Sequence, residues 1–463
     1  MDIAGKEDGD ETIFPLPDGT VYSRRKNFLP LTSPPLEAYA TLLGQEKLDR
    51  LQQAADKVRG LKLLELNATA QGGGVAEMLQ SYVPFLDSLG VEVEWKIITG
   101  NKEYFECTKG MHNLLQGMEG SFTEEMERTY LDNLETCAIM SPIDFRPDAV
   151  TVHDPQPLCM THYLKQGDGI WLWRCHIDIE SVALENNVRL VDLFSDCIEH
   201  YNAAIFSAAH YVVSRWRMPK FIIPPFIDPL ADKNRELSSQ ESEEVLDRLE
   251  IDRNIPLILQ VGRFDPWKGI DRTIAAFREV RKQKSCQLVL VGSLAGDDPE
   301  GERVLVKIYE ETKDELDIHI LDLPPTSNIE INALQRAASL IMQPSTKEGF
   351  GLVVTEALWK SKPVITSDVG GIPLQVRDES TGYFFHSIED VVERIIYLLE
   401  NPAVAELIGQ AGCRYVADHF LMPDRLADYL MAIDIIRNTY RNNEMPADSI
   451  VSFHPWFKLN KRG

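Results

Sequence analysis

Long apolar runs, paired cysteines and a secretion signal are all missing from this sequence of 463 residues. No uninterrupted apolar stretch approaches the roughly 18 residues that a membrane-spanning helix needs. Residues 1–11 are acidic and polar, which argues against a secretion signal with a basic start and an apolar core. The seven cysteines include no C-x-x-C pair, which argues against a disulfide framework or a structural zinc site. We therefore expect a cytoplasmic protein with reduced thiols.

Positive charge is also scarce. The chain has 47 lysine and arginine residues against 72 aspartate and glutamate residues, which gives a formal net charge of −25 at pH 7. Such an acidic protein repels phosphate backbones and anionic lipids, so we expect neither a nucleic acid nor a membrane as partner. If the protein binds an anionic ligand, it has to gather its few cations at that site.

The remaining composition is that of an ordinary globular protein. Apolar residues make up 44% of the chain and charged residues 26%. A chain of this length exceeds what one hydrophobic core supports, which predicts two domains. Strand-like and helical patterns alternate strictly, which is typical of parallel sheets covered on both faces. The expected fold class is α/β with two doubly wound, Rossmann-like domains over residues 1–222 and 223–423, joined near residues 220–235.

Apolar and β-branched runs give the expected strands. In the first domain they cover residues 61–66, 91–98, 149–152 and 211–214. In the second domain they cover residues 256–261, 287–291, 318–321, 340–342 and 363–366. Helical spacing predicts helices over residues 36–58, 75–89, 238–252, 270–281 and 328–338. Ligands of such folds bind where strand ends meet helix N-termini, which places a site in the cleft between the domains.

The most informative segment is residues 344–357, PSTKEGFGLVVTEA. A strand leads into a loop with two glycines and then into a helix, whose N-terminus offers free N–H groups and a positive dipole to an anion. Glu348 and Glu356 could accept hydrogen bonds from hydroxyl groups beside that anion, as in a sugar nucleotide. Taken alone, the pair is more typical of a helix start, with Glu348 near the dipole and Glu356 on a solvated face.

Two cations follow the first strand of the second domain. Arg263 offers a bidentate fork for phosphate oxygens, and Lys268 adds a point charge five residues later. At a strand end that faces the same cleft as Glu348, they indicate phosphate binding. The alternative is that Arg263 pairs with a buried acid and Lys268 is a solvated residue at a helix start.

A run of three glycines, Gly72, Gly73 and Gly74, follows the first strand of the first domain. It matches neither G-x-G-x-x-G nor a Walker A loop. A flexible tight turn explains it, as does close backbone approach to a phosphate at the start of the next helix.

Polar residues also gather at strand ends of the first domain. His153 and Asp154 follow the strand over residues 149–152, although a lone histidine is more often a partner within the fold than a catalyst. Residues 171–178, WLWRCHID, contain Arg174 and His176 among aromatic rings, a combination that suits sugar recognition. The alternative is an aromatic core patch capped by Arg174.

No metal site is evident in the sequence. The strict D-x-D pair, Asp8 and Asp10, lies in the acidic leader, where we expect disorder. His176 and Asp178 point to opposite sides of an extended segment, so they do not share a metal.

Together these motifs resemble the retaining GT-B glycosyltransferases of family 4, over roughly residues 61–420. The crossing at residues 224–228, PPFID, fits that family too. Residues 67–77, 113–117, 153–158 and 173–178 are most similar to its trehalose glycosyltransferring synthases, and retaining trehalose phosphorylases share much of this pattern. The resemblance implies a GT-B fold with two domains facing across a cleft. It also implies that the last helix, within residues 424–463, packs back on the first domain.

The resemblance implies a retaining transfer of glucose from a nucleotide diphosphate glucose to glucose, which gives trehalose reversibly. Arg263 and Lys268 would hold the diphosphate, Glu348 would contact the donor glucose, and Glu356 would accept from the ribose. Backbone N–H groups would complete the donor site at Gly72, Gly73, Gly74, Phe350, Gly351 and Leu352. The residues implied on the acceptor side are His153, Asp154, Arg174 and His176. The implied catalytic residues are Arg263, Lys268, Glu348 and His153.

Several questions stay open at the level of sequence. The residues require no cofactor, and a divalent metal carried by the nucleotide is compatible with them. The partners implied are the donor, glucose or trehalose, and, from the resemblance alone, a second copy of the chain in a homodimer. The alternatives are a trehalose phosphorylase and a family 4 glucosyltransferase with another acceptor. The intact set of Arg263, Lys268, Glu348 and Glu356 counts against a non-catalytic sugar-nucleotide sensor. The base of the donor is not specified.

Overall fold

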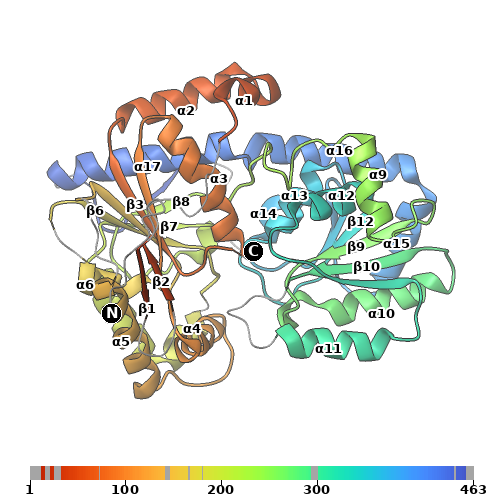
Figure 1. Cartoon of the computed structure of the whole chain (residues 1–463), viewed down its shortest axis with the longest axis horizontal. Helices are drawn as coiled ribbons and strands as arrows, with labels where there is room; N and C mark the ends of the chain where they lie inside the picture. Colours follow the sequence, from red (N-terminus) through yellow and green to blue (C-terminus); the bar gives the residue numbers. More distant parts are fainter. Residues whose placement is uncertain are drawn as a thin grey trace, which may run out of the picture.

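The computed structural model describes residues 12–15, 21–24, 33–71, 73–140, 146–164, 167–179, 181–293, 301–442 and 445–454. Two parallel sheets, each flanked by helices, lie side by side (Figure 1). A small antiparallel pair, β1 (Thr12–Pro15) with β2 (Val21–Arg24), lies outside both sheets. The prediction of an α/β fold with two doubly wound parallel sheets is confirmed.

The first sheet has seven strands in the order β15-β8-β7-β6-β5-β3-β4, and all its pairs are parallel. The strands are β3 (Lys62–Asn67), β4 (Glu92–Ile97), β5 (Ala149–His153), β6 (Ile170–Cys175), β7 (Ala203–Phe206), β8 (Lys220–Ile222) and β15 (Ile450–Ser452). Every residue of β5 is buried, as expected for a strand covered on both faces. The chain order reverses between β3 and β5, which makes this pair the switch point of the sheet.

The second sheet has six parallel strands in the order β11-β10-β9-β12-β13-β14. They are β9 (Leu257–Val261), β10 (Gln287–Gly292), β11 (Ile318–Asp322), β12 (Leu340–Gln343), β13 (Val364–Thr366) and β14 (Gly382–Phe384). The order is that of a dinucleotide-binding Rossmann sheet, with the switch point between β9 and β12. Ligand-binding residues are therefore expected after these two strands.

Helices connect the strands of both sheets. Before β8 they are α1 (Leu36–Leu43), α2 (Gln45–Lys57), α3 (Gly74–Ser88), α4 (Lys102–Leu115), α5 (Glu124–Met140), α6 (Thr161–Leu164), α7 (Ser181–Asn186) and α8 (Val188–Ile198). After β8 they are α9 (Ser239–Arg248), α10 (Ile270–Arg281), α11 (Gly301–Thr312), α12 (Asn328–Ala337), α13 (Leu352–Trp359), α14 (Ile372–Gln375), α15 (Ile388–Glu400), α16 (Pro402–His419) and α17 (Met422–Asn442). Short 3₁₀ turns are η1 (Leu158–Met160), η2 (Ala209–Tyr211) and η3 (Pro266–Lys268). None of the helices in the described part of the chain has the length and apolarity that a membrane crossing requires.

Helix α17 returns from the second sheet to the first, where it lies beside α2 and α3 (Figure 1). Its apolar face enters the same core cluster as the apolar face of α2, through Leu426, Leu430 and Ile433. Arg50 of α2 and Arg425 of α17 both contact the carboxylate of Asp428, which is buried. After α17 the chain adds β15 to the edge of the first sheet beside β8.

Two expected elements differ from the structure. The strand expected over residues 211–214 is wrong: η2 ends at Tyr211, and the strands of this region are β7 and β8 on either side. Four buried residues, Ala203 to Phe206, make β7, which is too short a run to stand out in the sequence. The helix expected over residues 36–58 is split into α1 and α2, because the chain turns at Gly44.

The expectation that all thiols are reduced is also wrong for one pair. Cys159 of η1 and Cys197 of α8 form a disulfide, with their Cα atoms 5.1 Å apart. The other five cysteines are free thiols. Spacing in the sequence could not show this pair, because the fold brings together residues that are 38 positions apart.

Candidate active site

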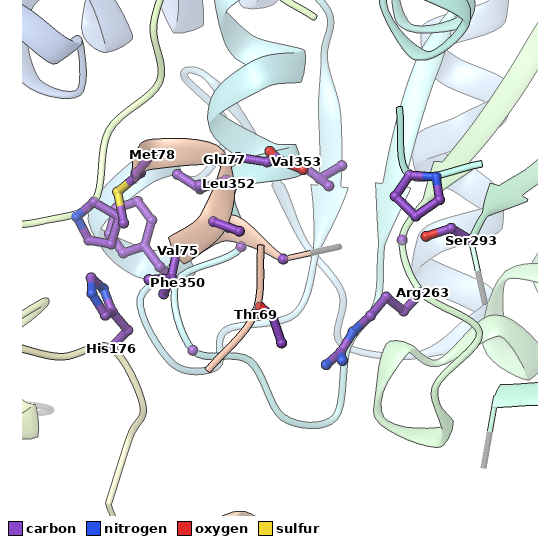
Figure 2. Close-up of a pocket in the computed structure, with 18 of the residues that line it drawn as sticks. Thr69, Val75, Glu77, Met78, His176, Arg263, Ser293, Phe350, Leu352 and Val353 are labelled. Carbon is purple, nitrogen blue, oxygen red and sulfur yellow. The ribbon is translucent and has the colours of Figure 1, made fainter. Parts of the chain in front are cut away.

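A cavity of about 380 Å³ lies where the carboxyl ends of both sheets meet. Thr69 follows β3 and Asp154 follows β5, while Arg263 follows β9 and Ser293 follows β10. Figure 2 shows Arg263 and Ser293 on one side of the cavity and His176 with Phe350 on the other. The cavity therefore opens at the switch points of both sheets, where doubly wound folds bind ligands.

Two helices begin at this cavity. Helix α3 starts at Gly74 and α13 starts at Leu352, and a Cβ added to Gly74 would lie 3.0 Å from Leu352 Cδ1. Gly73, Phe350 and Gly351 line the cavity beside them. Free N–H groups and the positive ends of two dipoles thus converge on one space, which suits an anion. Gly72, which we predict in the donor site, lies outside the described residues.

The predicted phosphate cations both line the cavity. The Arg263 side chain is 36% exposed, with its Nη2 3.9 Å from Asp265 Oδ2. Lys268 is not a solvated residue: its Nζ donates to Glu348 Oε2 at 2.7 Å. Lys109, from α4 of the first domain, reaches across to Asp265 at 3.2 Å. The two sheets are thus joined by an ion pair beside the cations.

The loop that carries Arg263 and Lys268 contacts the loop before α13 at Gly269. This residue has a φ of +64°, and a Cβ there would lie 2.2 Å from the carbonyl oxygen of Pro344. The Thr346 N–H donates to the carbonyl of Trp267 at 2.7 Å. Only glycine fits this contact, so the position of Lys268 relative to Glu348 depends on it.

Glu348 lies between polar groups rather than at a free helix start. Its Oε2 accepts from Lys268, from Ser345 Oγ at 3.2 Å and from Gln343 Nε2 at 3.4 Å. A Cβ on the following Gly349 would lie 2.9 Å from the carbonyl oxygen of His176. The carboxylate therefore belongs to a loop that presses against the end of β6.

Glu356 is only 1% exposed, which rules out the solvated face. Its Oε1 lies 3.1 Å from Lys233 Nζ, and its Oε2 accepts from Gln335 Nε2 at 3.0 Å. Burial raises the pKa of Glu356, but the ammonium groups of Lys233 and Lys360 outweigh burial, so the net pKa lies below the usual value. The side chain is therefore a buried carboxylate in the wall of the cavity.

His153 and His176 form a stacked pair in the wall of the cavity. Burial lowers the pKa of both rings, so each is neutral near pH 7. His153 Nε2 donates to Glu65 Oε2 at 2.9 Å, and its Nδ1 lies 3.2 Å from His176 Nε2. A neutral His153 then accepts at Nδ1, so His176 donates from Nε2 and keeps Nδ1 as an acceptor. That buried Nδ1 has no hydrogen-bond partner among the described residues.

Asp154 lines the cavity, whereas Arg174 does not. The Oδ1 of Asp154 accepts from the His176 N–H at 2.7 Å, and burial raises the pKa of Asp154 to about 7. Arg174 is buried behind the histidines, where its guanidinium lies over the rings of Phe226 and Tyr429. The structure therefore brings together three of the four residues that we predict on the acceptor side.

Sequence reasoning missed several polar residues of this region. His112 of α4 lines the cavity, and burial, together with the charges of Lys109 and Arg263, lowers its pKa to about 4. Glu77 and Lys233 line it near Glu356. The sequence does carry one sign of Glu65, because a carboxylate inside the buried strand KLLELN needs polar partners. Among the described residues, no group of three His, Cys, Asp or Glu could hold a metal ion.

Two family models match the chain. Residues 65–213 match the model described as trehalose synthase, N-terminal domain, and residues 241–414 match the model described as glycosyl transferases group 1. The chain is 40% identical to a trehalose synthase of Pyrococcus horikoshii over 400 residues, which cover 85% of this chain and 95% of that protein.

One more distant relative and one solved structure are also similar to this chain. A trehalose phosphorylase of Pleurotus pulmonarius is 28% identical over 404 residues, which cover 75% of this chain and 53% of that protein. Among solved structures, a UDP-forming trehalose-phosphate synthase from Burkholderia xenovorans superposes with a TM-score of 0.65 at 15% identity, over 82% of this chain and 99% of that one. That likeness supports the fold, which is GT-B.

Proposed function

The chain belongs to the trehalose synthase family and is a glycosyltransferase, and from that premise we propose the reaction that it catalyses. It transfers a glucosyl group from a nucleotide diphosphate glucose to free glucose. The product is α,α-trehalose, the configuration at the donor's anomeric carbon is retained, and the reaction is reversible.

The observation that carries this proposal is the arrangement of positive charge in the cavity. Arg263, Lys268 and the N-termini of α3 and α13 line one space, and Lys268 is held by Glu348 at 2.7 Å. Departure of a diphosphate needs cations and N–H groups that are in place before the bond breaks. In the proposed complex, Arg263 and Lys268 bind the diphosphate and stabilise its growing charge.

In this proposal, two glutamates accept hydrogen bonds from the hydroxyl groups of the donor. Glu348, next to Lys268, accepts from the donor glucose near its anomeric carbon. Glu356 accepts from the ribose, because each of its oxygens uses one lone pair on Lys233 or Gln335 and keeps another. Its lowered pKa keeps it ionised at neutral pH, as an acceptor of two hydroxyl groups has to be.

The acceptor glucose lies against the histidine pair in this proposal. The lone pair of His176 Nδ1 accepts from a sugar hydroxyl, which would satisfy a buried polar atom that has no partner among the described residues. Asp154 holds the His176 backbone in place. His153, held by Glu65, fixes the ring of His176 in the tautomer that can accept.

The proposed chemical step takes place on one face of the donor sugar. The bond between the anomeric carbon and the diphosphate oxygen breaks, and the diphosphate leaves with the bonding electrons. The acceptor hydroxyl attacks the same face of the oxocarbenium-like sugar, and its proton passes to the leaving phosphate oxygen. Trapping of a glucosyl group covalently bound to an aspartate or glutamate would contradict this step.

Phosphorolysis of trehalose is the second candidate, because a trehalose phosphorylase matches over 75% of this chain. In this second candidate function, Arg263 and Lys268 bind inorganic phosphate in place of the diphosphate. Incubation with trehalose and phosphate, without nucleotide, separates the two functions: glucose 1-phosphate forms only if the enzyme is a phosphorylase.

The main test is incubation with UDP-, ADP- and GDP-glucose, each with free glucose, followed by NMR of the product. We expect an α,α-1,1 linkage and release of one nucleoside diphosphate per trehalose. A parallel set with EDTA tests the proposal that no protein-bound metal is needed, and the expected rate is unchanged. Absence of trehalose with every donor would refute the proposed function.

A further inference from the structure

Three parts of the molecule meet at one ammonium group in the wall of the cavity. Lys233 lies between the two sheets in the chain, after β8 and before α9. Its Nζ lies 3.0 Å from both carboxylate oxygens of Glu77, on α3, and 3.1 Å from Glu356 Oε1, on α13. Figure 2 shows Glu77 beside Val353, the residue that follows the start of α13. One lysine therefore joins a carboxylate of each domain.

We propose that Lys233 is a positioning residue for the donor: it holds Glu356 ionised and oriented toward the ribose, and it neutralises Glu77 across the junction of the domains. This inference rests on the proposed function, in which Glu356 accepts from the ribose. Without Lys233, the carboxylates of Glu77 and Glu356 would face each other in a partly buried site without the ammonium that they share.

The geometry gives Lys233 little freedom for any other role. Its side chain is 14% exposed, and its neighbour Asn234 accepts from Lys360 Nζ at 3.1 Å through Oδ1. Asn234 also donates to the carbonyl of Asp228 at 2.9 Å, which fixes the turn that carries Lys233. The charges of Lys233, Lys360 and Glu77 act on Glu356, and burial lowers the pKa of Lys360 to about 7.

The test measures binding of UDP, ADP and GDP by calorimetry, so that it does not depend on turnover. The variants are Lys233→Met, Glu77→Gln and the double variant, with Lys282→Met as the control. Lys282 is an exposed lysine of another ion pair, 2.6 Å from Glu279, and it does not line the cavity. We expect Lys233→Met to weaken binding of the preferred nucleotide about tenfold, the size of one charge-assisted hydrogen bond. We expect Lys282→Met to bind as the native protein does.

Two further readouts separate positioning from mere structural support. Loss of Lys233 raises the pKa of Glu356, so the defect of Lys233→Met should grow as the pH falls from 6 to 5, a range in which Lys360, with its pKa of about 7, stays charged. The double variant should regain about threefold in affinity over Lys233→Met, because the neutral amide that Glu77→Gln introduces does not repel Glu356. If Lys233→Met does not fold, as judged by circular dichroism, Lys233→Gln carries the same comparison.

The outcomes are distinct for the two proposals. If the native protein binds none of the three nucleotides, the proposed function fails. If it binds one of them, and Lys233→Met (or Lys233→Gln in its place) binds that nucleotide as tightly as the native protein does at both pH 6 and pH 5, the role of Lys233 is refuted. A uniform loss in Lys233→Met that is independent of pH and is not relieved by Glu77→Gln also refutes it.

Discussion

Lys268 reaches the cavity from a 3₁₀ turn, and its ammonium contacts Glu348 at 2.7 Å. We expect Lys268→Ala to lower kcat by about 10²–10³-fold, the cost of losing one preorganised charge at a leaving group. The measurement is trehalose formation under saturating donor. Lys307→Ala, on the exposed surface of α11, serves as the control and should keep full activity. A normal kcat in Lys268→Ala would remove this residue from its role.

Glu65 acts on the cavity only through other side chains. It is buried and accepts from His153 Nε2 at 2.9 Å and from the Tyr429 hydroxyl at 2.8 Å. A glutamine offers one oxygen and one NH₂ group, so one of these two donors loses its acceptor. We expect Glu65→Gln to lower the free energy of unfolding by about 1–3 kcal/mol and to lower kcat, because the His153 tautomer is no longer fixed.

Denaturation and kinetics check this prediction together. Nucleotide binding should stay near the native level in Glu65→Gln, since its partners His153 and Tyr429 are not among the residues that we propose to bind the nucleotide. Glu94→Gln on β4, whose side chain pairs with Lys96 at 3.4 Å near the surface, is the matched control. An unchanged kcat with a reduced stability would show that Glu65 supports the fold alone.

At the scale of residues, the sequence predicts those candidate site residues that lie at the end of a strand. Arg263 and Glu348 follow recognisable strands, His153 is the last residue of one, and the structure places all three at the cavity. Lys233 could not be found in this way, since its two partners are held by helices far away in the chain and Glu77 alone is 156 positions distant. The paired position of Lys268 likewise depends on a contact between two loops.

Among the structural elements, the turn at Gly269 brings the loop after β9 into contact with the loop after β12. A Cβ there would meet the Pro344 carbonyl at 2.2 Å, and the φ of +64° disfavours any other residue. We expect Gly269→Ala to destabilise the protein by about 1–3 kcal/mol or more and to weaken nucleotide binding, since η3 has to move. Thermal denaturation and calorimetry measure the two effects.

Gly73→Ala is the control for this glycine, because it lies at the start of α3 in extended backbone with no atom within 4 Å of an added Cβ. Its stability should stay within about 0.5 kcal/mol of the native value. Equal stability of both variants would contradict the strained contact at Gly269.

Elements with strong apolar runs were predictable, and short or polar ones were not. The runs of β9 and β10 were expected within a residue or two, because each is buried along its whole length. Residues 171–178, WLWRCHID, are predicted to be a sugar-recognition cluster, yet residues 171–175 belong to the central strand β6 and Arg174 is buried. An arginine that lies over aromatic rings gives no signal of burial in the sequence.

For the whole molecule, α17 is the main connection back to the first sheet, and Asp428 is one of its buried charged residues, with Asp424 and Arg425. Burial alone would raise the pKa of Asp428. The hydrogen bond with His454 and the charges of Arg425 and Arg50 outweigh burial, so the net pKa lies below the usual value. We expect Asp428→Asn to cost about 3 kcal/mol of unfolding free energy at pH 7, as for other broken buried pairs.

The pH dependence follows from the sign of that shift. A depressed pKa contributes stability above the unfolded value of about 3.9 and loses it as the pH falls through the folded value. The difference between the native protein and Asp428→Asn should therefore shrink below about pH 4. Urea denaturation from pH 7 to pH 3 measures it, with Asp434→Asn, a partly exposed residue of the same helix, as control. A difference that is constant with pH would contradict the role of this carboxylate.

The two-sheet plan was predictable from strict alternation of strands and helices, because covered parallel strands need apolar runs. The boundaries at residues 222 and 423 and the proposed homodimer stay predictions. The return of the chain to the first sheet could not be derived from pattern, since β15 is three residues long and pairs with a strand more than two hundred positions earlier.

That late strand has a consequence for how the protein is made. The edge of β8 takes its partner β15 only after the ribosome has synthesised the whole second sheet, and until then it exposes unpaired N–H and C=O groups. The amino-terminal half alone should therefore expose the unpaired edge of β8 and aggregate. Supplied in trans, a fragment spanning α17 and β15 should bind this half and restore its solubility.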